Sequence, residues 1–246
     1  MPATWNGILS TSRSEPLSLP GLAWPVELRP HPTARSMKLR VDEARQRLIL
    51  TFPRRMSRRS ALDWAVKQAE WVEGQLGRID PAEPIVAGGL IPFEGRPVRL
   101  VWDAALPRMP RLEADQLQCG GPEPGFAPRI ERFLRAEARR KLSEATEDAA
   151  RRAGLSVRSV SVGDAATRWG SCSATGAIRY NWRIVMAPPR LLRWLVAHEV
   201  AHRRHMDHGP QFRKLETELY DGDVRLARAE LRALGPRLKR VGRSIA

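Results

Sequence analysis

The sequence has 246 residues, 42% of them hydrophobic, so it is long enough to bury a substantial core and too apolar for a disordered protein. Its formal net charge of +15 makes nucleic acid a candidate partner, although the basic residues are spread along the chain without a recognisable nucleic-acid-binding motif. The two cysteines exclude a disulfide framework, and neither a secretory pattern nor a run of ~18 apolar residues is present, so we expect a cytoplasmic protein.

The first half of the chain predicts β structure with one helix. Residues 1–25 are rich in proline, serine and glycine, which is typical of an irregular arm. Residues 36–41 and 47–52 alternate apolar and polar side chains and predict a β-hairpin. Residues 57–76 show helical spacing of apolar side chains, with a serine that can cap the start and a glycine that follows the end. Residues 92–102 predict a second hairpin or strand pair.

The second half of the chain predicts helices and strands in alternation. Residues 128–154 form a long amphipathic pattern that predicts a helix, and residues 156–164 and 177–186 predict strands. Two adjacent prolines then open a further helix. Four of the five histidines of the chain lie in the second half of this helix and in the turn that follows it. Two further helical segments complete the pattern, over residues 209–220 and 222–234.

A glycine- and proline-rich run at residues 120–125 is the best candidate for a domain boundary. We therefore expect three parts: an arm over 1–25, a β-rich region with one helix over 26–120, and a domain with an antiparallel sheet over 126–246. Strands followed by segregated helices are typical of an α+β fold.

The pattern H-E-V-A-H at His198, Glu199 and His202 predicts a metal-dependent hydrolase. Histidines four residues apart lie on the same face of a helix, so both imidazoles can reach one ion at about 2.0–2.1 Å. Glu199 lies ~100° round the helix from His198, because one turn takes 3.6 residues. It is therefore placed to act on a water molecule as general base, and not as a third ligand.

A catalytic zinc usually has three protein ligands, so a third is needed from His205 or His208. His205 is seven residues beyond His198, which is ~10.5 Å along a continuous helix and too far to share one ion. His208 lies among turn-forming residues and can swing back if the helix ends near His205, so we prefer His208. The alternatives are an exposed helix that binds no metal and a structural zinc, which would leave Glu199 without a role.

Residues 167–212 contain R-W-G-S-C and H-E-V-A-H, followed by His208 after five further residues, and they resemble the YgjP-like metallopeptidase family. That family is related to the SprT-like and zincin metalloproteases, and the resemblance extends over roughly residues 28–215. It implies a zincin-like domain with an active-site helix and one zinc ion, with Glu199 as catalytic base and the ligands His198, His202 and His208. By resemblance alone it also offers three residues for a substrate cleft: Trp169, Ser171 and Asn181. For Trp169, core packing is an equally good interpretation.

Three functions follow from these patterns as hypotheses. The first is a zinc-dependent peptidase that cleaves a protein or peptide by attack of a Glu199-activated water on a peptide carbonyl. The strand predicted just before the histidine helix, residues 177–185, could then pair with an extended substrate. The second is a nucleic-acid-binding protein that uses its basic surface, and the third is a protease associated with DNA.

Overall fold

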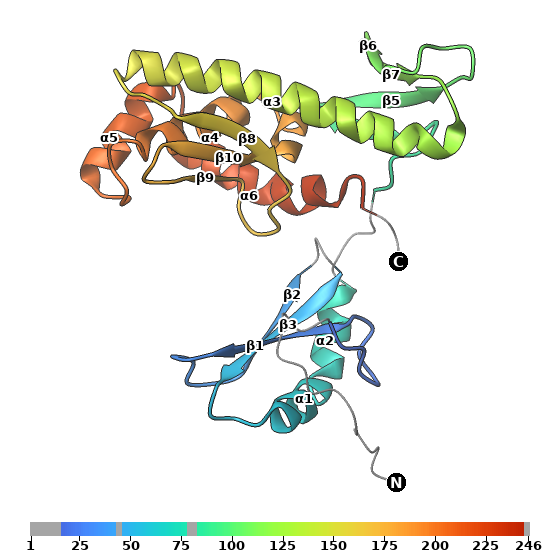
Figure 1. Cartoon of the computed structure of the whole chain (residues 1–246), viewed down its shortest axis with the longest axis vertical. Coiled ribbons are helices and arrows are strands. Elements are labelled where there is room, and N and C mark those ends of the chain that lie inside the picture. The colour runs from blue at the N-terminus through green and yellow to red at the C-terminus, as the bar shows by residue number, and fades with distance from the viewer. Residues whose placement is uncertain (1–15, 43–45, 78–82, 244–246) are drawn as a thin grey trace. The chain divides into compact units, whose positions relative to one another are not determined.

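The computed structural model describes residues 16–42, 46–77 and 83–243. The chain divides into two compact units, Met1–Asp80 and Pro81–Ala246, which we call the N-terminal unit and the C-terminal unit (Figure 1). Residues 1–15, which make up most of the expected arm, lie outside the described ranges.

The division between the units falls earlier than the predicted boundary at residues 120–125. That run lies inside the C-terminal unit, because the strands before it and the long helix after it share one core. Leu100 and Leu117 from the strands and Ile130 from the helix are all buried in this core. A glycine- and proline-rich link therefore joins two parts of one unit here.

The N-terminal unit is a three-stranded sheet followed by two helices. Its strands are β1 (Val26–His31), β2 (Lys38–Asp42) and β3 (Arg47–Pro53), in the order β1-β3-β2. The predicted hairpin is present as the antiparallel pair β2 and β3, and β1 joins β3 in parallel. The helices α1 (Arg58–Val66) and α2 (Ala69–Leu76) occupy the stretch where the sequence predicts one helix.

The interruption between α1 and α2 lies at Lys67 and Gln68. The N–H of Gln68 donates to the carbonyl of Ala65, only three residues back, at 3.0 Å, so the helical hydrogen bonding tightens there. Ser57 caps α1 as expected, because its hydroxyl accepts from the N–H of Ser60 at 3.0 Å. The core of this unit is separate from that of the C-terminal unit and is formed by Leu28, Leu48, Leu50, Phe52, Ala61, Ala65 and Val72, among others.

The C-terminal unit is built along α3 (Phe126–Arg152), the helix that the sequence predicts over 128–154 (Figure 1). One face of α3 is buried at regular four-residue intervals, at Ile130, Leu134, Ala138, Leu142 and Thr146. The helix ends at Arg152, and Gly154 follows two residues later with a φ of +62°, the left-handed conformation that glycine adopts without strain.

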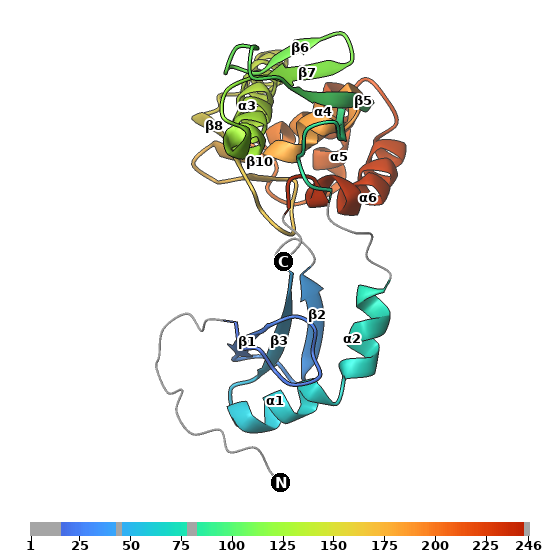
Figure 2. The same ribbon diagram turned by 90° about the vertical axis from the view of Figure 1, so that its right-hand side faces the viewer.

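One sheet of this unit has the order β4-β5-β7-β6, and Figure 2 shows it beside the N-terminal part of α3. The hairpin of β4 (Leu90–Phe93) and β5 (Arg96–Trp102) is the one predicted over residues 92–102. The strands β6 (Arg111–Glu113) and β7 (Gln116–Cys119) were not predicted from the sequence. They have only three and four residues, too few for an alternating pattern to stand out.

The second sheet has the order β8-β10-β9, from β8 (Ser159–Gly163), β9 (Gly170–Cys172) and β10 (Ala177–Asn181). β10 is central, antiparallel to β9 and parallel to β8, so the expected antiparallel pairing is present between β9 and β10, but the sheet as a whole is mixed. The link after β8 leads to the opposite edge of the sheet, and the chain then returns by a hairpin into the middle. Residues Trp182–Met186 leave the sheet as a buried 3₁₀ turn, η3, which shortens the strand predicted to reach residue 186.

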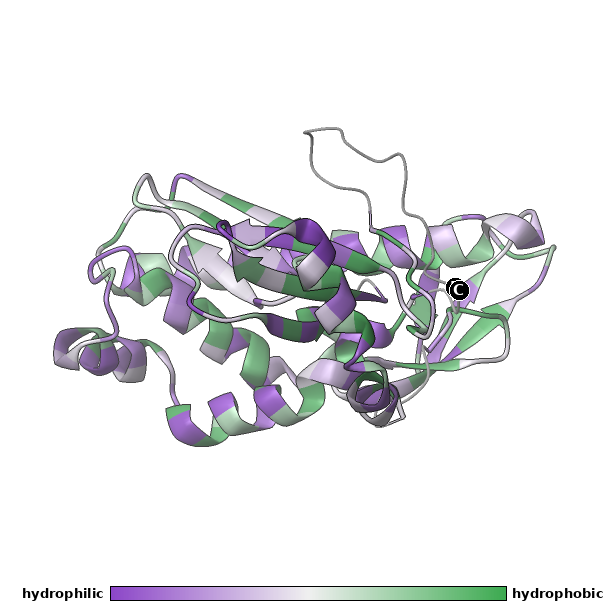
Figure 3. Cartoon of the chain, turned by 90° about the horizontal axis from the view of Figure 1, so that it is seen from below, coloured by the Kyte–Doolittle hydropathy of each residue, from purple (hydrophilic) through white to green (hydrophobic). Residues whose placement is uncertain are grey.

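Three helices follow this sheet: α4 (Pro189–Ala201), α5 (Pro210–Leu219) and α6 (Val224–Arg240). α4 begins at a proline, as predicted, and most of its residues are buried against its neighbours. α5 and α6 expose one polar side, and Figure 3 shows apolar and polar residues side by side along the helices. Within the described ranges, no helix combines the length and apolar character that crossing a membrane requires.

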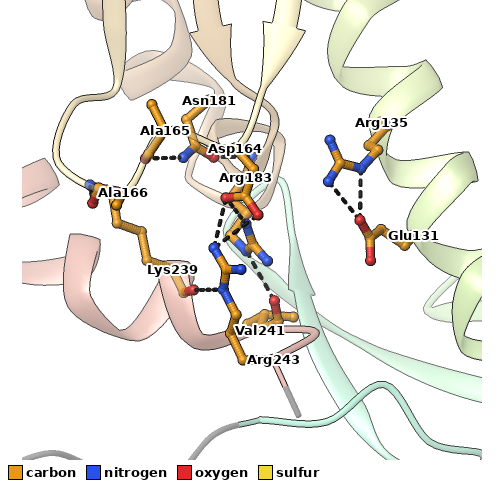
Figure 4. A network of polar contacts seen from close by, with 10 residues as sticks. All are labelled: Glu131, Arg135, Asp164, Ala165, Ala166, Asn181, Arg183, Lys239, Val241 and Arg243. Atoms are coloured by element: carbon orange, nitrogen blue, oxygen red, sulfur yellow. Dashed lines mark hydrogen bonds and ion pairs between the residues drawn. The ribbon is translucent and has the colours of Figure 1, made fainter. Parts of the chain in front are cut away.

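A polar network ties η3 to the end of the described chain (Figure 4). Arg183 is buried, and its guanidinium donates to the Asp164 carboxylate and to the carbonyl of Val241. Arg243 binds the same carboxylate at 2.8 and 2.9 Å. Burial lowers the pKa of Arg183 to about 10, while the charge of Asp164 opposes that shift, so the side chain stays protonated at neutral pH. The network fixes the segment after α6 against the sheet.

Candidate metal centre

The imidazoles of His198, His202 and His208 meet at one point of the C-terminal unit. Each offers one ligand atom, and these atoms all lie within 4.8 Å of one another. The Nε2 atoms of His198 and His208 are 3.3 Å apart. Tetrahedral coordination with bonds of about 2.0–2.1 Å separates two donor atoms by about 3.3 Å, so this spacing suits a zinc-sized ion.

His208 reaches the other two histidines because α4 ends early. Helix α4 ends at Ala201 with His202 as its C-cap, and the last turn closes with the N–H of His205 on the carbonyl of Ala201 at 3.0 Å, so the condition that the sequence set for His208, a helix end near His205, is met. The chain then turns, and the Asp207 carboxylate accepts a hydrogen bond from the N–H of Gly209 at 2.9 Å, just before α5 begins. This turn returns His208 to the face of the helix, and the ring of His205 is not part of the cluster.

Two of the three imidazoles have a hydrogen-bond partner that decides their tautomer. His198 Nδ1 lies 2.9 Å from the Glu216 carboxylate, and His202 Nδ1 lies 3.1 Å from the carbonyl oxygen of His205. Both partners are acceptors when Glu216 is ionised, so Nδ1 carries the proton in each ring and Nε2 presents its lone pair. Burial lowers the pKa of His202, which favours the neutral ring that can bind a cation.

Glu199 lies beside this cluster and is only 4% exposed. Burial raises the pKa of its carboxyl group to about 7, while the charges of His198 and Arg168 act in the opposite direction. A carboxyl group with this pKa can both accept and release a proton near neutral pH, as a general base and acid must. Gly170 of β9 packs so closely against the Glu199 carboxylate that an added Cβ would overlap it.

Of the three residues suggested for a substrate cleft, Asn181 is occupied elsewhere. It is 1% exposed, its amide nitrogen donates to the carbonyl of Ala165 at 2.9 Å, and its amide oxygen accepts from the N–H of Arg183 at 3.0 Å. Both ends of the amide thus hold the chain around η3, and neither is available to a substrate.

Trp169 and Ser171 flank Gly170 near the edge of the second sheet. The indole of Trp169 is partly buried against α6, with Lys239 Nζ 4.9 Å from the ring centroid, so core packing describes its contacts best. Ser171 belongs to β9, an edge strand, and is partly exposed. Ser171 and the partly buried Trp169 therefore stay predictions for contact with a substrate, and Asn181 does not.

Glu216 was not predicted as part of the centre. Its carboxylate is buried and accepts hydrogen bonds from His198 and from the Trp194 indole at 3.1 Å, with Arg228 at 3.7 Å. Burial would raise the pKa of Glu216, but these donors together hold it below the ordinary value, so the carboxylate is ionised. The sequence does carry a signal, because position 216 shares a helix face with the apolar residues Phe212 and Leu219.

A comparison with protein-family models finds that the YgjP-like metallopeptidase domain matches residues 35–234. The match includes all three clustered histidines, Glu199 and Glu216. Neither curated proteins nor solved structures gave a significant match.

Proposed function

The chain belongs to the YgjP-like metallopeptidase family, and on this premise we propose that it is a zinc-dependent peptidase with one ion bound by His198, His202 and His208. The observation that carries the proposal is the convergence of these imidazoles beside a buried carboxylate, Glu199. A zincin-like arrangement, in which the active-site helix lies over a short sheet, is part of the same proposal. It is supported by the packing of Gly170 in β9 against Glu199 of α4.

Glu199 is the proposed general base and acid. When bound, the cation would lower the pKa of a water molecule toward ~7 and polarise the scissile carbonyl. The Glu199 carboxylate takes a proton from the attacking water and later returns it to the leaving amine, so that the peptide C–N bond breaks. A pKa of about 7 for Glu199 suits both transfers.

The outer edge of β9, which is the edge strand of its sheet, is the proposed docking site for an extended substrate. The strand considered for this role from the sequence, β10, already has a partner on each side. On either side of β9, the carbonyl of Trp169 accepts from the N–H of Asn181 at 2.7 Å, and the N–H of Ser173 donates to the carbonyl of Ala177 at 2.9 Å, so these groups face β10. Main-chain groups alternate along a strand, so those of Gly170 and Cys172 point away from β10 and can pair with a peptide beside Glu199.

The test is hydrolysis of a fluorescently labelled casein together with elemental analysis of the purified protein. We expect Glu199→Gln to keep its zinc and to hydrolyse casein about 10²–10⁴-fold more slowly than wild type, because only the proton-transfer group is removed. The exposed Glu218→Gln serves as the matched control and should behave as wild type. Unchanged hydrolysis by Glu199→Gln would remove this residue from the mechanism.

The same assay tests the choice of ligand. We expect His208→Ala to lose most of its zinc, and His205→Ala to keep it, because only the main-chain carbonyl of His205 contacts the centre. Loss of metal from His205→Ala alone would overturn the ligand set.

A further inference from the structure

We propose that Glu216 is a positioning residue of the metal centre, which holds the proton of His198 on Nδ1 and so keeps Nε2 free to bind a cation. The inference rests on the proposed function for the meaning of the site, and on the contacts of Glu216 for its physical basis. Glu216 comes from α5, whereas His198 comes from α4, so the contact joins two helices across 18 residues of sequence.

Glu216 makes three contacts, and each one fixes its carboxylate in place. Oε1 accepts from His198 Nδ1 at 2.9 Å and from Trp194 Nε1 at 3.1 Å, and Oε2 lies 3.7 Å from Arg228 Nη2. Trp194 is one turn before His198 on α4, and Arg228 comes from α6. Three helices therefore converge on one carboxylate that is 1% exposed.

The burial of Glu216 indicates a role beyond packing. A buried carboxylate costs free energy unless it is paired, and an apolar side chain of similar size would pack between Phe212, Leu215 and Leu219 without that cost. The indole of Trp194 and the guanidinium of Arg228 compensate for part of the burial. Neither of them requires the carboxylate to contact a histidine of the cluster.

The contact matters because a neutral imidazole can carry its proton on either nitrogen. If the proton of His198 were on Nε2, it would block the lone pair at the centre of the cluster, where His208 Nε2 is only 3.3 Å away. An anionic acceptor at Nδ1 stabilises the productive tautomer and orients the ring. For His202 a main-chain carbonyl, that of His205, has the same effect.

This difference between His198 and His202 supplies an internal control. Substitution of Glu216 removes the acceptor at His198, while the carbonyl at His202 remains. The first measurement is therefore the tautomer of both rings in metal-free, full-length protein, by long-range ¹H–¹⁵N NMR about two pH units above the ordinary histidine pKa of ~6.5. We expect Glu216→Ala to shift His198 toward the Nε2–H tautomer and to leave His202 with its proton on Nδ1.

The second measurement is the dissociation constant for Zn²⁺, by competition with a chromogenic chelator. We expect Glu216→Ala to bind Zn²⁺ about 10–100-fold more weakly, as substitutions of such orienting residues typically do. Glu216→Gln keeps an oxygen acceptor without the charge, so its loss of affinity should be smaller but still measurable. Glu218→Gln, an exposed acidic residue on the same helix, is the matched control and should bind as wild type.

The outcomes separate this inference from the proposed function. If wild type does not bind Zn²⁺, the proposed function fails, whereas the tautomer measurement still tests the role of Glu216. If Glu216→Ala is folded by circular dichroism and His198 keeps its proton on Nδ1, the inference is wrong. If Glu216→Ala does not fold, Glu216→Gln decides, because Zn²⁺ affinity equal to that of Glu218→Gln would overturn the proposal.

Discussion

At the scale of single residues, Gly170 decides where the Glu199 carboxylate can lie. A Cβ at this position would overlap one carboxylate oxygen and would stand 2.7 Å from the carboxyl carbon. The φ of Gly170 is outside the left-handed region, so its backbone would accept an alanine without strain. The absence of a side chain is therefore needed for space and not for conformation.

We expect Gly170→Ala to lower hydrolysis and to leave zinc binding intact. The added methyl group must push Glu199 aside, and a misplacement of about 1 Å at a reacting group can cost ~10²-fold in rate. The three atoms nearest to the new methyl group all belong to Glu199, and none belongs to a histidine. The measurement is hydrolysis of labelled casein beside elemental analysis.

Gly74→Ala is the control for this substitution, since nothing lies within 4 Å of a Cβ at that position. Hydrolysis by Gly74→Ala should equal that of wild type. A Gly170→Ala protein with full activity would show that Glu199 does not depend on this space.

At the scale of elements, Arg203 anchors the end of α4. Its guanidinium donates to the carbonyls of Ser156 at 3.0 Å and of Ala174 at 3.2 Å, on the loop before β8 and in the turn between β9 and β10. Gly176 makes room for this side chain, because a Cβ there would stand 2.9 Å from the guanidinium carbon. The helix that carries the histidines is thus fixed to the sheet that carries Gly170.

The start of α6 depends on Asp223. Its carboxylate accepts from the N–H groups of Leu226 and Arg225 at 3.0 and 2.7 Å, which otherwise have no partner in the first turn of a helix. These hydrogen bonds, that of Leu226 first, lower the pKa of Asp223. The stabilisation is therefore complete above the unfolded-state pKa of ~3.9 and is lost as the pH falls through the lower folded-state value.

We expect Asp223→Ala to lower the urea midpoint of unfolding at pH 7 and the difference from wild type to narrow as the pH falls below about 4. Asp223→Asn should lie between the two, because its amide oxygen still accepts a hydrogen bond but without the charge. A difference between Asp223→Ala and wild type that stays constant over this pH range would contradict the assignment of Asp223 as an ionised cap.

The elements that the sequence predicted have strong local signals. The proline pair at 188 and 189 opens α4, Gly154 follows α3, and Ser57 caps α1, because each depends on residues next to one another in the chain. The parallel pairing of β8 with β10 depends on the path of the link between them, which no local pattern encodes. Prediction therefore located the helical segments, although it gave α1 and α2 as one helix, and it fell short for the strand arrangement.

The same distinction holds within the candidate site. His198, Glu199 and His202 are recognisable together because a helix turn sets their spacing. The assignment of His208 depended on where α4 ends, and the turn-forming residues around His208 indicated that end. Glu216 was missed because its partner His198 lies in another helix, and only tertiary packing brings the two together.

At the scale of the whole molecule, the candidate metal centre lies entirely in the C-terminal unit, Pro81–Ala246. The matched family domain, residues 35–234, also includes most of the N-terminal unit. Among the described residues, every histidine of the cluster therefore belongs to the C-terminal unit, while the family match extends over part of the N-terminal unit as well.

The net charge of +15 is shared by both units. Residues 1–80 hold 13 basic and 8 acidic residues, and residues 81–246 hold 29 and 19, so neither unit concentrates the excess. Basic side chains that are spread over both units can contact the phosphates of DNA, and such contacts carry no sequence information. Recognition of a base sequence instead requires several side chains placed together in one DNA groove. Any binding to DNA should therefore be electrostatic and independent of sequence.

We expect the full chain to bind two unrelated DNA duplexes with equal affinity, measured by fluorescence anisotropy. If three phosphates are contacted, the affinity should fall about 40-fold between about 50 and about 200 mM salt, because counterions are released on binding. Binding that is absent at the lower salt concentration would exclude a nucleic-acid role for the charge. Binding that persists unchanged at the higher concentration, or that prefers one duplex, would instead require a dedicated recognition surface.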